Sequence, residues 1–210
     1  VLEFYEKNTF KETFNRLFES FLIVSFESFT EHSKLISRYL VLMEAVIGEY
    51  LTLFLSFDGM IMQHHLQILI FIFNLDDQNF SEQAQRILIL LGSSLYQYEI
   101  PEFEQKCGTA MRCIIQTTFN HILKINMIYR LTNELIYTFL MNFSMLRNAF
   151  FDSIIEKIGP DEMKDELHFI FSRIKNAFIE IDNAKALNLL EQSLRTLIGY
   201  TRDHGIDISL

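Results

Sequence analysis

The chain has little proline and glycine and no tryptophan. Only 2 of its 210 residues are proline and 7 are glycine. An ordinary all-β domain needs both residue types at its many turns, so their scarcity argues against that class of fold. Half of the residues are hydrophobic, which is enough for a continuous core. The composition therefore favours a helical protein with short connections.

Basic residues are also few. The chain has 18 Lys and Arg residues against 27 Asp and Glu residues, which gives a net charge of −9. A surface that binds nucleic acid needs clustered Lys and Arg to neutralise phosphates, and we find no such cluster. We therefore expect no nucleic-acid partner.

Cysteine is limited to Cys107 and Cys113. On one helix, two positions six residues apart lie on different faces, so a disulfide between them is unfavourable. Two free thiols suit a reducing compartment. The first residues lack the basic and apolar regions of a signal peptide, and they lack an initial Met. We therefore expect a fragment of a longer protein.

Long uncharged runs are nearly absent. The longest extends from Gly59 to Leu75, which is slightly short for a bilayer, and it contains polar residues such as Gln63 and Asn74. We expect a buried helix at this place and no membrane span.

Apolar residues recur at spacings of three and four along the chain, which is the helical period. The predicted helices are 10–25, 30–54, 60–74, 81–98, 101–124, 126–142, 143–158, 163–180 and 184–202. The pair 126–142 and 143–158 is either two helices or one bent helix, and Gly159-Pro160 ends it.

Several residues predict where these helices begin. Thr9 with Glu12 fits a capping box that opens the first helix. Ser81 and Asn183 are the predicted caps of two later helices. Gly48 is a candidate bend in the helix 30–54.

The longer helices predict a repeat. They begin near residues 31, 81, 126 and 160, so successive starts are 50, 45 and 34 residues apart. HEAT-type arrays repeat two helices about every 40–47 residues. The alternative is an irregular helical bundle. Short connections make neighbouring helices antiparallel in both architectures.

No catalytic, cofactor or metal site is predicted. His64 and His65 are adjacent, so on a helix they point about 100° apart and cannot chelate one ion as an i, i+4 pair can. We interpret them as solvated or core histidines. The sequence lacks a glycine-rich phosphate loop and a nucleophilic serine motif. The acidic residues near Asp161 and Asp165 fall at the start of a helix, where they complement its dipole.

The helix 101–124 has one polar and one apolar side. The polar stripe consists of Glu102, Gln105, Thr109, Arg112, Gln116 and Asn120. The apolar side consists of Phe103, Cys107, Ala110, Met111, Ile114 and Phe119. In a HEAT-like stack this would be the second helix of its pair, so the stripe would face the concave surface. We take Glu102, Gln105, Thr109, Arg112 and Gln116 as the candidate partner-binding residues; the alternative is an ordinary solvated face.

Two blocks of the chain carry a family resemblance. The first is Phe151 to Ile206, in which an aromatic-led helix, a helix with Phe169, Phe171, Ile174 and Phe178, and a Leu-rich helix follow each other. The second is Phe14 to Leu75, with Phe14, Leu17, Phe18, Lys34-Leu35-Ile36, Tyr39, Leu42 and Met43. In order and spacing they resemble the C-terminal part of importin-β-type nuclear transport receptors of the exportin-7 and exportin-4 group. The stretch from Asn126 to Phe150 departs from the pattern, because family members carry more sequence there.

The resemblance implies an all-α fold, a right-handed α-α superhelix of HEAT or armadillo-like antiparallel helix pairs. Residues 1–210 would be a single repeat region at the C-terminal end of a longer receptor without enzymatic activity and without cofactors. The implied partners are protein cargo and, through the full-length receptor, Ran-GTP and Phe-Gly nucleoporins, but neither nucleic acid nor membrane. Such receptors shuttle between nucleus and cytoplasm through nuclear pores, and their main Ran-contacting repeats lie near the N-terminus.

Two other classes compete with this interpretation. One is a HEAT-like scaffold or adaptor outside nuclear transport. The other is an all-helical enzyme or ligand-binding bundle, which would need a pocket with convergent polar or ionisable groups.

Overall fold

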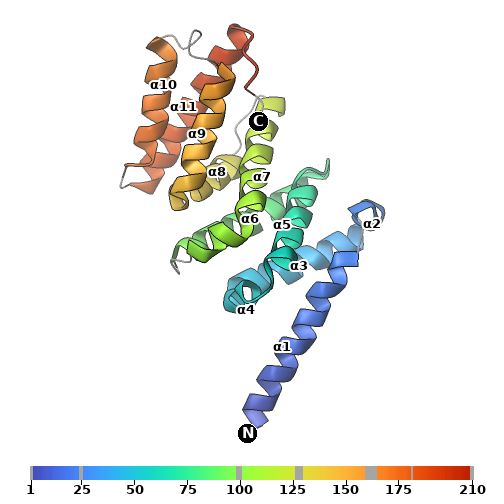
Figure 1. Ribbon diagram of the computed structural model, residues 1–210. Helices are drawn as coiled ribbons and strands as arrows, with labels where there is room; N and C mark the ends of the chain where they lie inside the picture. The colour runs from blue at the N-terminus through green and yellow to red at the C-terminus, as the bar shows by residue number, and fades with distance from the viewer. Residues whose placement is uncertain are drawn as a thin grey trace. The chain divides into compact units, whose positions relative to one another are not determined.

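The computed structural model describes residues 2–23, 26–97, 101–125, 130–158, 165–180 and 182–208. Every regular element in these ranges is a helix, which confirms the predicted all-α class (Figure 1). The chain forms two compact units, Val1–Ala110 and Met111–Leu210. Helix α7, Pro101–Ile125, is continuous through the boundary between them.

In the described part of the first unit, seven helical elements precede α7. They are α1 (Leu2–Ser20), the short 3₁₀ helix η1 (Phe21–Ile23), α2 (Phe26–Glu31), α3 (Ser33–Glu49), α4 (Leu51–Leu55), α5 (Gly59–Phe73) and α6 (Gln78–Gln97). Helix α6 packs against both α3 and α5, and η1 packs against α5. The predicted buried helix at 60–74 is α5, whose Met62, Leu66, Leu69 and Ile72 are buried.

The predicted capping box at Thr9 and Glu12 is wrong. Helix α1 already begins at Leu2 and continues through Thr9. The residues before Thr9 include Leu, Glu and Lys, which favour helix, and contain neither Gly nor Pro to stop it. A capping signal inside such a stretch does not start a new helix.

The predicted helix 30–54 is divided at two places. His32 (φ −130°, ψ 83°) separates α2 from α3, and Tyr50 (φ −125°, ψ 31°) separates α3 from α4. Gly48 is not the break, because α3 continues through it to Glu49. Of the apolar residues that recur at spacings of three and four in this segment, Leu35 is half-buried and Tyr50 is 43% exposed. The others are buried: Ile36, Tyr39, Leu40, Met43, Val46, Ile47, Leu51 and Phe54.

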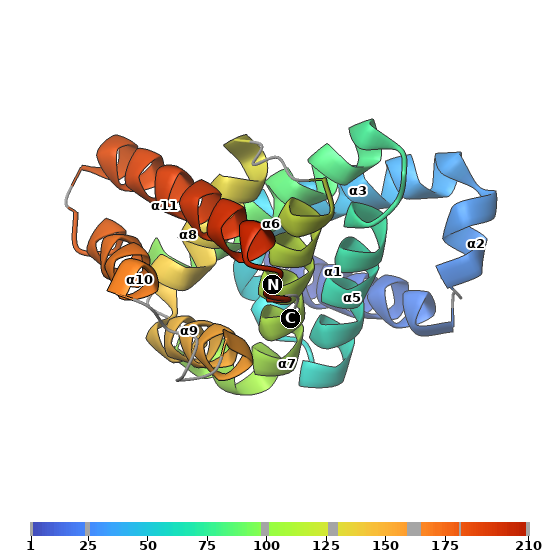
Figure 2. The same ribbon diagram turned by 90° about the horizontal axis from the view of Figure 1, so that it is seen from above.

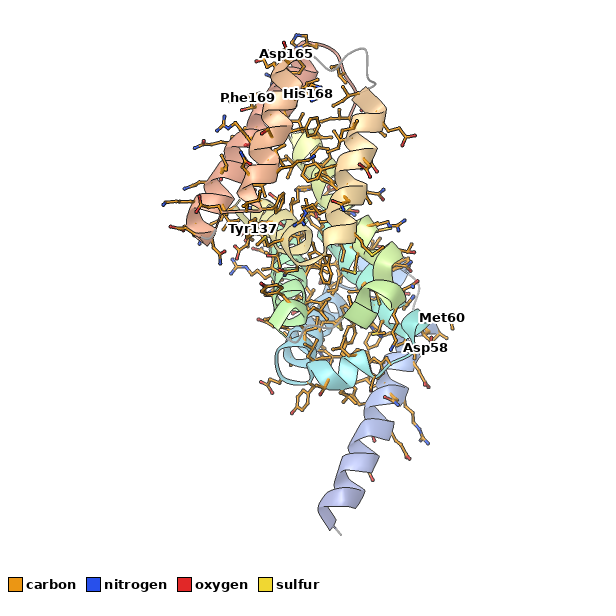
Figure 3. All side chains as sticks on the ribbon, turned by 60° about the vertical axis from the view of Figure 1, so that its left-hand side comes forward. Asp58, Met60, Tyr137, Asp165, His168 and Phe169 are labelled. Carbon is orange, nitrogen blue, oxygen red and sulfur yellow. The ribbon has the colours of Figure 1, made fainter. Side chains whose placement is uncertain are left out.

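Aspartates cap the next two helices. The Asp58 carboxylate accepts a hydrogen bond from the backbone N–H of Met60 at 2.8 Å, where α5 begins (Figure 3). Asp77 accepts from the N–H groups of Asn79 and Phe80 at 2.9 and 3.2 Å. The prediction of Ser81 as the cap of α6 is therefore wrong. The Ser81 hydroxyl is buried and donates to the Phe73 carbonyl at 2.7 Å, which ties α6 to the end of α5.

The second unit begins in the C-terminal half of α7. It continues with α8 (Arg130–Asn142), α9 (Ser144–Ile158), α10 (Asp165–Ala177) and α11 (Asn183–Asp203). Helices α8 and α9 are two helices, separated at Phe143. The predicted stop at Gly159-Pro160 lies outside the described residues. The cap of α11 is Asp182 and not Asn183, because the Asp182 carboxylate accepts from Ala184 and Lys185 N–H at 3.0 and 3.2 Å.

The helices of the second unit contact each other in a ring (Figure 2). Helix α8 packs on α9 and α11, and α10 packs on α11. Phe151 of α9 closes the ring, with its centroid 6.3 Å from the Phe171 ring of α10 and 6.2 Å from the Phe178 ring. A ring of four helices is also the arrangement of a four-helix bundle, the alternative that the sequence left open.

Residues at spacings of three and four form the apolar face of α10 and of the residue that follows it. Leu167, Phe171, Ile174 and Phe178 are all buried. Phe169, which also belongs to the family resemblance, is instead 63% exposed and projects from the outer side of α10 (Figure 3). The Arg173 guanidinium lies 6.0 Å from the Phe169 ring centroid, so the exposed ring is partly shielded by a cation on its own helix.

Truncating the buried face should be costly. We expect Phe171→Ala to lower the free energy of unfolding by about 3–5 kcal/mol, because it removes a buried ring and leaves a cavity. Ser172→Ala, at the next and exposed position, should change it by less than about 0.5 kcal/mol. Urea denaturation measures both. Equal effects would show that the buried face of α10 is misassigned. Lys175 is a poorer control, because its Nζ lies 5.9 Å from the Phe151 ring.

The cap of α11 can be tested in the same way. Asp182→Ala should cost about 1 kcal/mol, because two N–H groups at the helix start lose their acceptor. Asp182→Asn keeps an acceptor oxygen and should lower the free energy of unfolding by only about 0.3 kcal/mol. If the alanine and asparagine variants unfold at the same urea concentration, Asp182 is not the effective cap.

Candidate partner-binding surface on helix α7

The apolar side of α7 is buried as predicted. Phe103, Cys107, Ala110, Met111, Ile114 and Phe119 are each at most 1% exposed. Pro101 occupies the first turn, where its missing N–H leaves no hydrogen bond unmade. Burial of this side fixes the rotation of the helix about its axis, and therefore which residues face solvent.

The structure places three of the five candidate partner-binding residues. Thr109, Arg112 and Gln116 are exposed, at spacings of three and four on one side of α7. The side chains of Glu102 and Gln105 lie outside the described residues. The predicted polar stripe is thus exposed at these three residues, whereas Asn120 is half-buried. This exposure agrees with a partner-facing surface and equally with an ordinary solvated face.

Arg112 and Gln116 border a small groove between α7 and α9. Its other lining residues are Ile115, Leu146, Ala149, Phe150 and Ser153, and its volume is about 40 Å³. Drug-sized ligands and cofactors occupy pockets of roughly 300–1,000 Å³, so this groove admits the end of one side chain rather than a small-molecule cofactor. The sequence did not predict it, because α9 is brought to α7 only by tertiary packing.

The groove joins an apolar wall to a single charge. Phe150 packs edge-to-face on Phe119 with centroids 5.2 Å apart, so the wall is anchored in the core. Ser153 donates its hydroxyl hydrogen to the Ala149 carbonyl at 2.8 Å, which leaves its oxygen as an acceptor. Among the described residues, Arg112 is the only charged one that lines the groove. No salt bridge joins Arg112 to any side chain in the described ranges.

The first unit has a wider and more polar hollow. It lies between α3 and α6, has a volume of about 290 Å³, and is lined by Glu44, Asn79, Glu82, Gln83 and Arg86. The Arg86 guanidinium lies 3.8 Å from the Glu82 carboxylate and partly neutralises it. Its residues are exposed or half-buried, so the hollow has no desolvated group that would act as an acid, a base or a nucleophile.

His64 and His65 are hydrogen-bonded to backbone carbonyls. His65 is fully buried, and its Nε2 lies 3.2 Å from the carbonyl oxygen of Phe18. His64 Nε2 lies 3.0 Å from the carbonyl oxygen of Phe21. His65 is therefore a satisfied core residue, one of the two interpretations that the sequence favoured. Among the described residues, no group of three or more His, Cys, Asp or Glu side chains could hold a metal ion.

The comparisons with known proteins add no relative. No protein-family model matches the chain, and no curated protein sequence or solved structure matches it. Within the described ranges, none of the helices combines the length and the apolar composition that crossing a membrane requires.

The two cysteines of α7 should differ in reactivity. Burial raises the pKa of Cys107 to about 11, whereas Cys113 is only half-buried. Because the thiolate is the reactive form, one thiol per chain should be alkylated quickly near neutral pH. Cys113→Ser should remove this fast phase, and Cys107→Ser should leave it in place. Mass spectrometry after a timed iodoacetamide pulse measures it. Equal modification of both thiols in the folded protein would contradict the assigned faces of α7.

Proposed function

We propose that this chain is a protein-binding segment of HEAT-like helical repeats without enzymatic activity. We propose further that it forms the C-terminal repeats of a nuclear transport receptor resembling the exportin-7 and exportin-4 group. The observation that carries the protein-binding role is α7, whose apolar face is buried and whose opposite side exposes Thr109, Arg112 and Gln116. Arg112 and Gln116 also line a groove with an apolar wall.

The repeat architecture is part of this proposal. Antiparallel pairs are the unit of such arrays, and α8 with α9 and α10 with α11 are contacting pairs joined by short connections. In the proposed receptor, residues 1–210 form one region of a right-handed α-α superhelix. The ring of contacts in the second unit would then be the local packing of two successive pairs.

The proposed partner at the α7 groove is a cargo protein with an acidic side chain next to an apolar one. Arg112 supplies the cation, and Ile115, Leu146 and Phe150 supply the apolar wall. An Arg guanidinium binds a carboxylate with two parallel hydrogen bonds, which fixes the orientation of the bound side chain. Ran-GTP and Phe-Gly nucleoporins are proposed partners of the full-length receptor, which would shuttle between nucleus and cytoplasm.

The alternative function is a scaffold or adaptor outside nuclear transport. Binding of purified Ran to the longest natural protein that contains this chain separates the two. A transport receptor should bind Ran loaded with GTP far more tightly than Ran loaded with GDP, and Ran-GTP should change its affinity for cargo. Equal binding of the two nucleotide states, or none, would favour the scaffold.

Charge reversal tests the α7 groove. Arg112→Glu should weaken cargo binding at least tenfold with an unchanged melting temperature, because it places like charges opposite each other at an exposed position. Arg38→Glu makes the same change in charge at an exposed position of α3 and should leave the affinity unchanged. Isothermal titration calorimetry with a purified cargo measures both. If the two variants bind equally well, the α7 stripe is a solvated face.

A further inference from the structure

Three elements of the first unit meet at His65 of α5. Its imidazole lies among the rings of Phe18, Phe21 and Tyr39, whose centroids are 4.5, 5.7 and 6.0 Å from its own. Phe18 belongs to α1, Phe21 to η1 and Tyr39 to α3. The N-terminal segment formed by α1 and η1 is therefore held on α3 and α5 around a titratable side chain.

The hydrogen bonds of His65 determine its tautomer. The Phe18 carbonyl can only accept, so Nε2, 3.2 Å away, carries the hydrogen. Nδ1 then accepts a hydrogen bond from the Tyr39 hydroxyl at 3.0 Å. At neutral pH the ring is thus uncharged, and both of its nitrogens have partners.

The Tyr39 hydroxyl can also form a hydrogen bond with the protonated His65 ring. Its hydroxyl also lies 3.2 Å from the backbone carbonyl oxygen of His65. A hydroxyl both donates and accepts, so Tyr39 can turn its hydrogen to that carbonyl and accept a hydrogen bond from Nδ1–H. Protonation of His65 therefore need not break the local hydrogen bonds; what it adds is a buried charge.

The groups around His65 stabilise a positive charge on its ring only weakly. Burial lowers the pKa of His65 from 6.5 to about 4; the Phe18 carbonyl counteracts this in part, and the neighbouring His64 adds to it. Burial also raises the pKa of Tyr39 well above its usual value, so the phenol stays neutral beside the ring.

Tyr39 and His64 are the titratable groups next to the ring in the described part of the chain. The charged side chains described on the elements around it point into solvent, except that Glu82 is half-buried and lies 3.8 Å from Arg86. They are Glu12, Arg16, Glu19, Glu31, Lys34, Arg38, Glu44, Glu49, Asp58 and Arg86. Among the described residues, a protonated His65 would thus be surrounded by aromatic rings with no carboxylate to pair with its charge. The unfavourable burial of this charge would destabilise the packing of α1 and η1 over the ring, which excludes water from it.

We infer that His65 is an acid-sensitive latch for the N-terminal segment: when the ring takes up a proton, α1 and η1 separate from α3 and α5 while α3, α5 and α6 stay packed together. The two histidines hold this segment by carbonyls three residues apart, Phe18 through His65 and Phe21 through His64. Helix α6 packs on α3 and α5 independently of α1. Release therefore gives water access to the ring without unfolding the rest of the unit.

The direction of the pH effect follows from the two states. The released state binds a proton with the ordinary pKa of 6.5, and the latched state binds it only near pH 4. The released state binds more protons in this window, so lowering the pH favours it. The population of the released state should rise on the order of 100-fold between about pH 7 and pH 4.

Hydrogen exchange of the whole chain tests the latch. Amide protection, corrected for the chemical exchange rate at each pH, is measured by mass spectrometry for peptides from 12–23 and for peptides of α3 and α6. In the unmodified protein the opening of 12–23 should increase about 100-fold towards pH 4, while α3 and α6 keep their protection. His65→Gln should abolish the increase, because a Gln amide can donate to Phe18 and accept from Tyr39 but does not titrate.

The matched control is His204→Gln. His204 is an exposed histidine that follows α11 in the other unit, so this variant should keep the full acid response of 12–23. An unchanged acid response in His65→Gln would overturn the proposal. So would a simultaneous loss of protection in α3 and α6, which indicates general acid unfolding. If His65→Gln does not fold, an NMR titration of the His65 ring in the unmodified protein decides instead: its midpoint must coincide with the opening of 12–23.

Discussion

Each helix of this protein depends on a neighbour to cover its apolar face. Helices of 13 to 25 residues, such as α8 and α7, are marginally stable alone in water, because helix nucleation is unfavourable. Aromatic rings provide much of the cover. Phe18 lies in contact distance of Phe14, Phe54 and Phe57 in the first unit, and Phe151 contacts Phe171 and Phe178 in the second. Burial of these faces determines the rotation of every helix and hence which side chains a partner can reach.

Three buried polar side chains join one helix to another. Ser81 binds the Phe73 carbonyl, Asn133 of α8 donates to the Leu187 carbonyl of α11 at 3.0 Å, and His65 binds the Phe18 carbonyl. Each side chain reaches a carbonyl of another helix rather than competing for its own backbone. Such bonds add little net stability, but a mispacked arrangement would leave the buried group unpaired. They therefore favour one relative placement of the helices within each unit.

The side of an amphipathic helix on which a side chain lies determines its chemistry, as His65 and the α7 stripe illustrate. A side chain on the buried side of a helix has its chemistry set by desolvation, as the low pKa of His65 and the high pKa of Cys107 illustrate. A side chain on the opposite side, such as Arg112, is exposed to solvent and is available for recognition. The proposed cargo contact and the proposed latch thus arise from opposite sides of amphipathic helices.

The amino-acid sequence by itself determined the all-α class, the position of α5 as a largely buried helix, the buried faces of α7 and α10, and the exposure of Thr109, Arg112 and Gln116. These follow from the helical period, which is a local property of the chain. It did not determine the caps at Asp77 and Asp182, where neighbouring polar residues compete and the geometry of the connection selects one. It also did not show the break at Tyr50, the Tyr39–His65–Phe18 hydrogen bonds or the groove between α7 and α9. The hydrogen bonds and the groove bring together residues far apart in the chain, and only the tertiary packing of complementary apolar faces decided which of them meet.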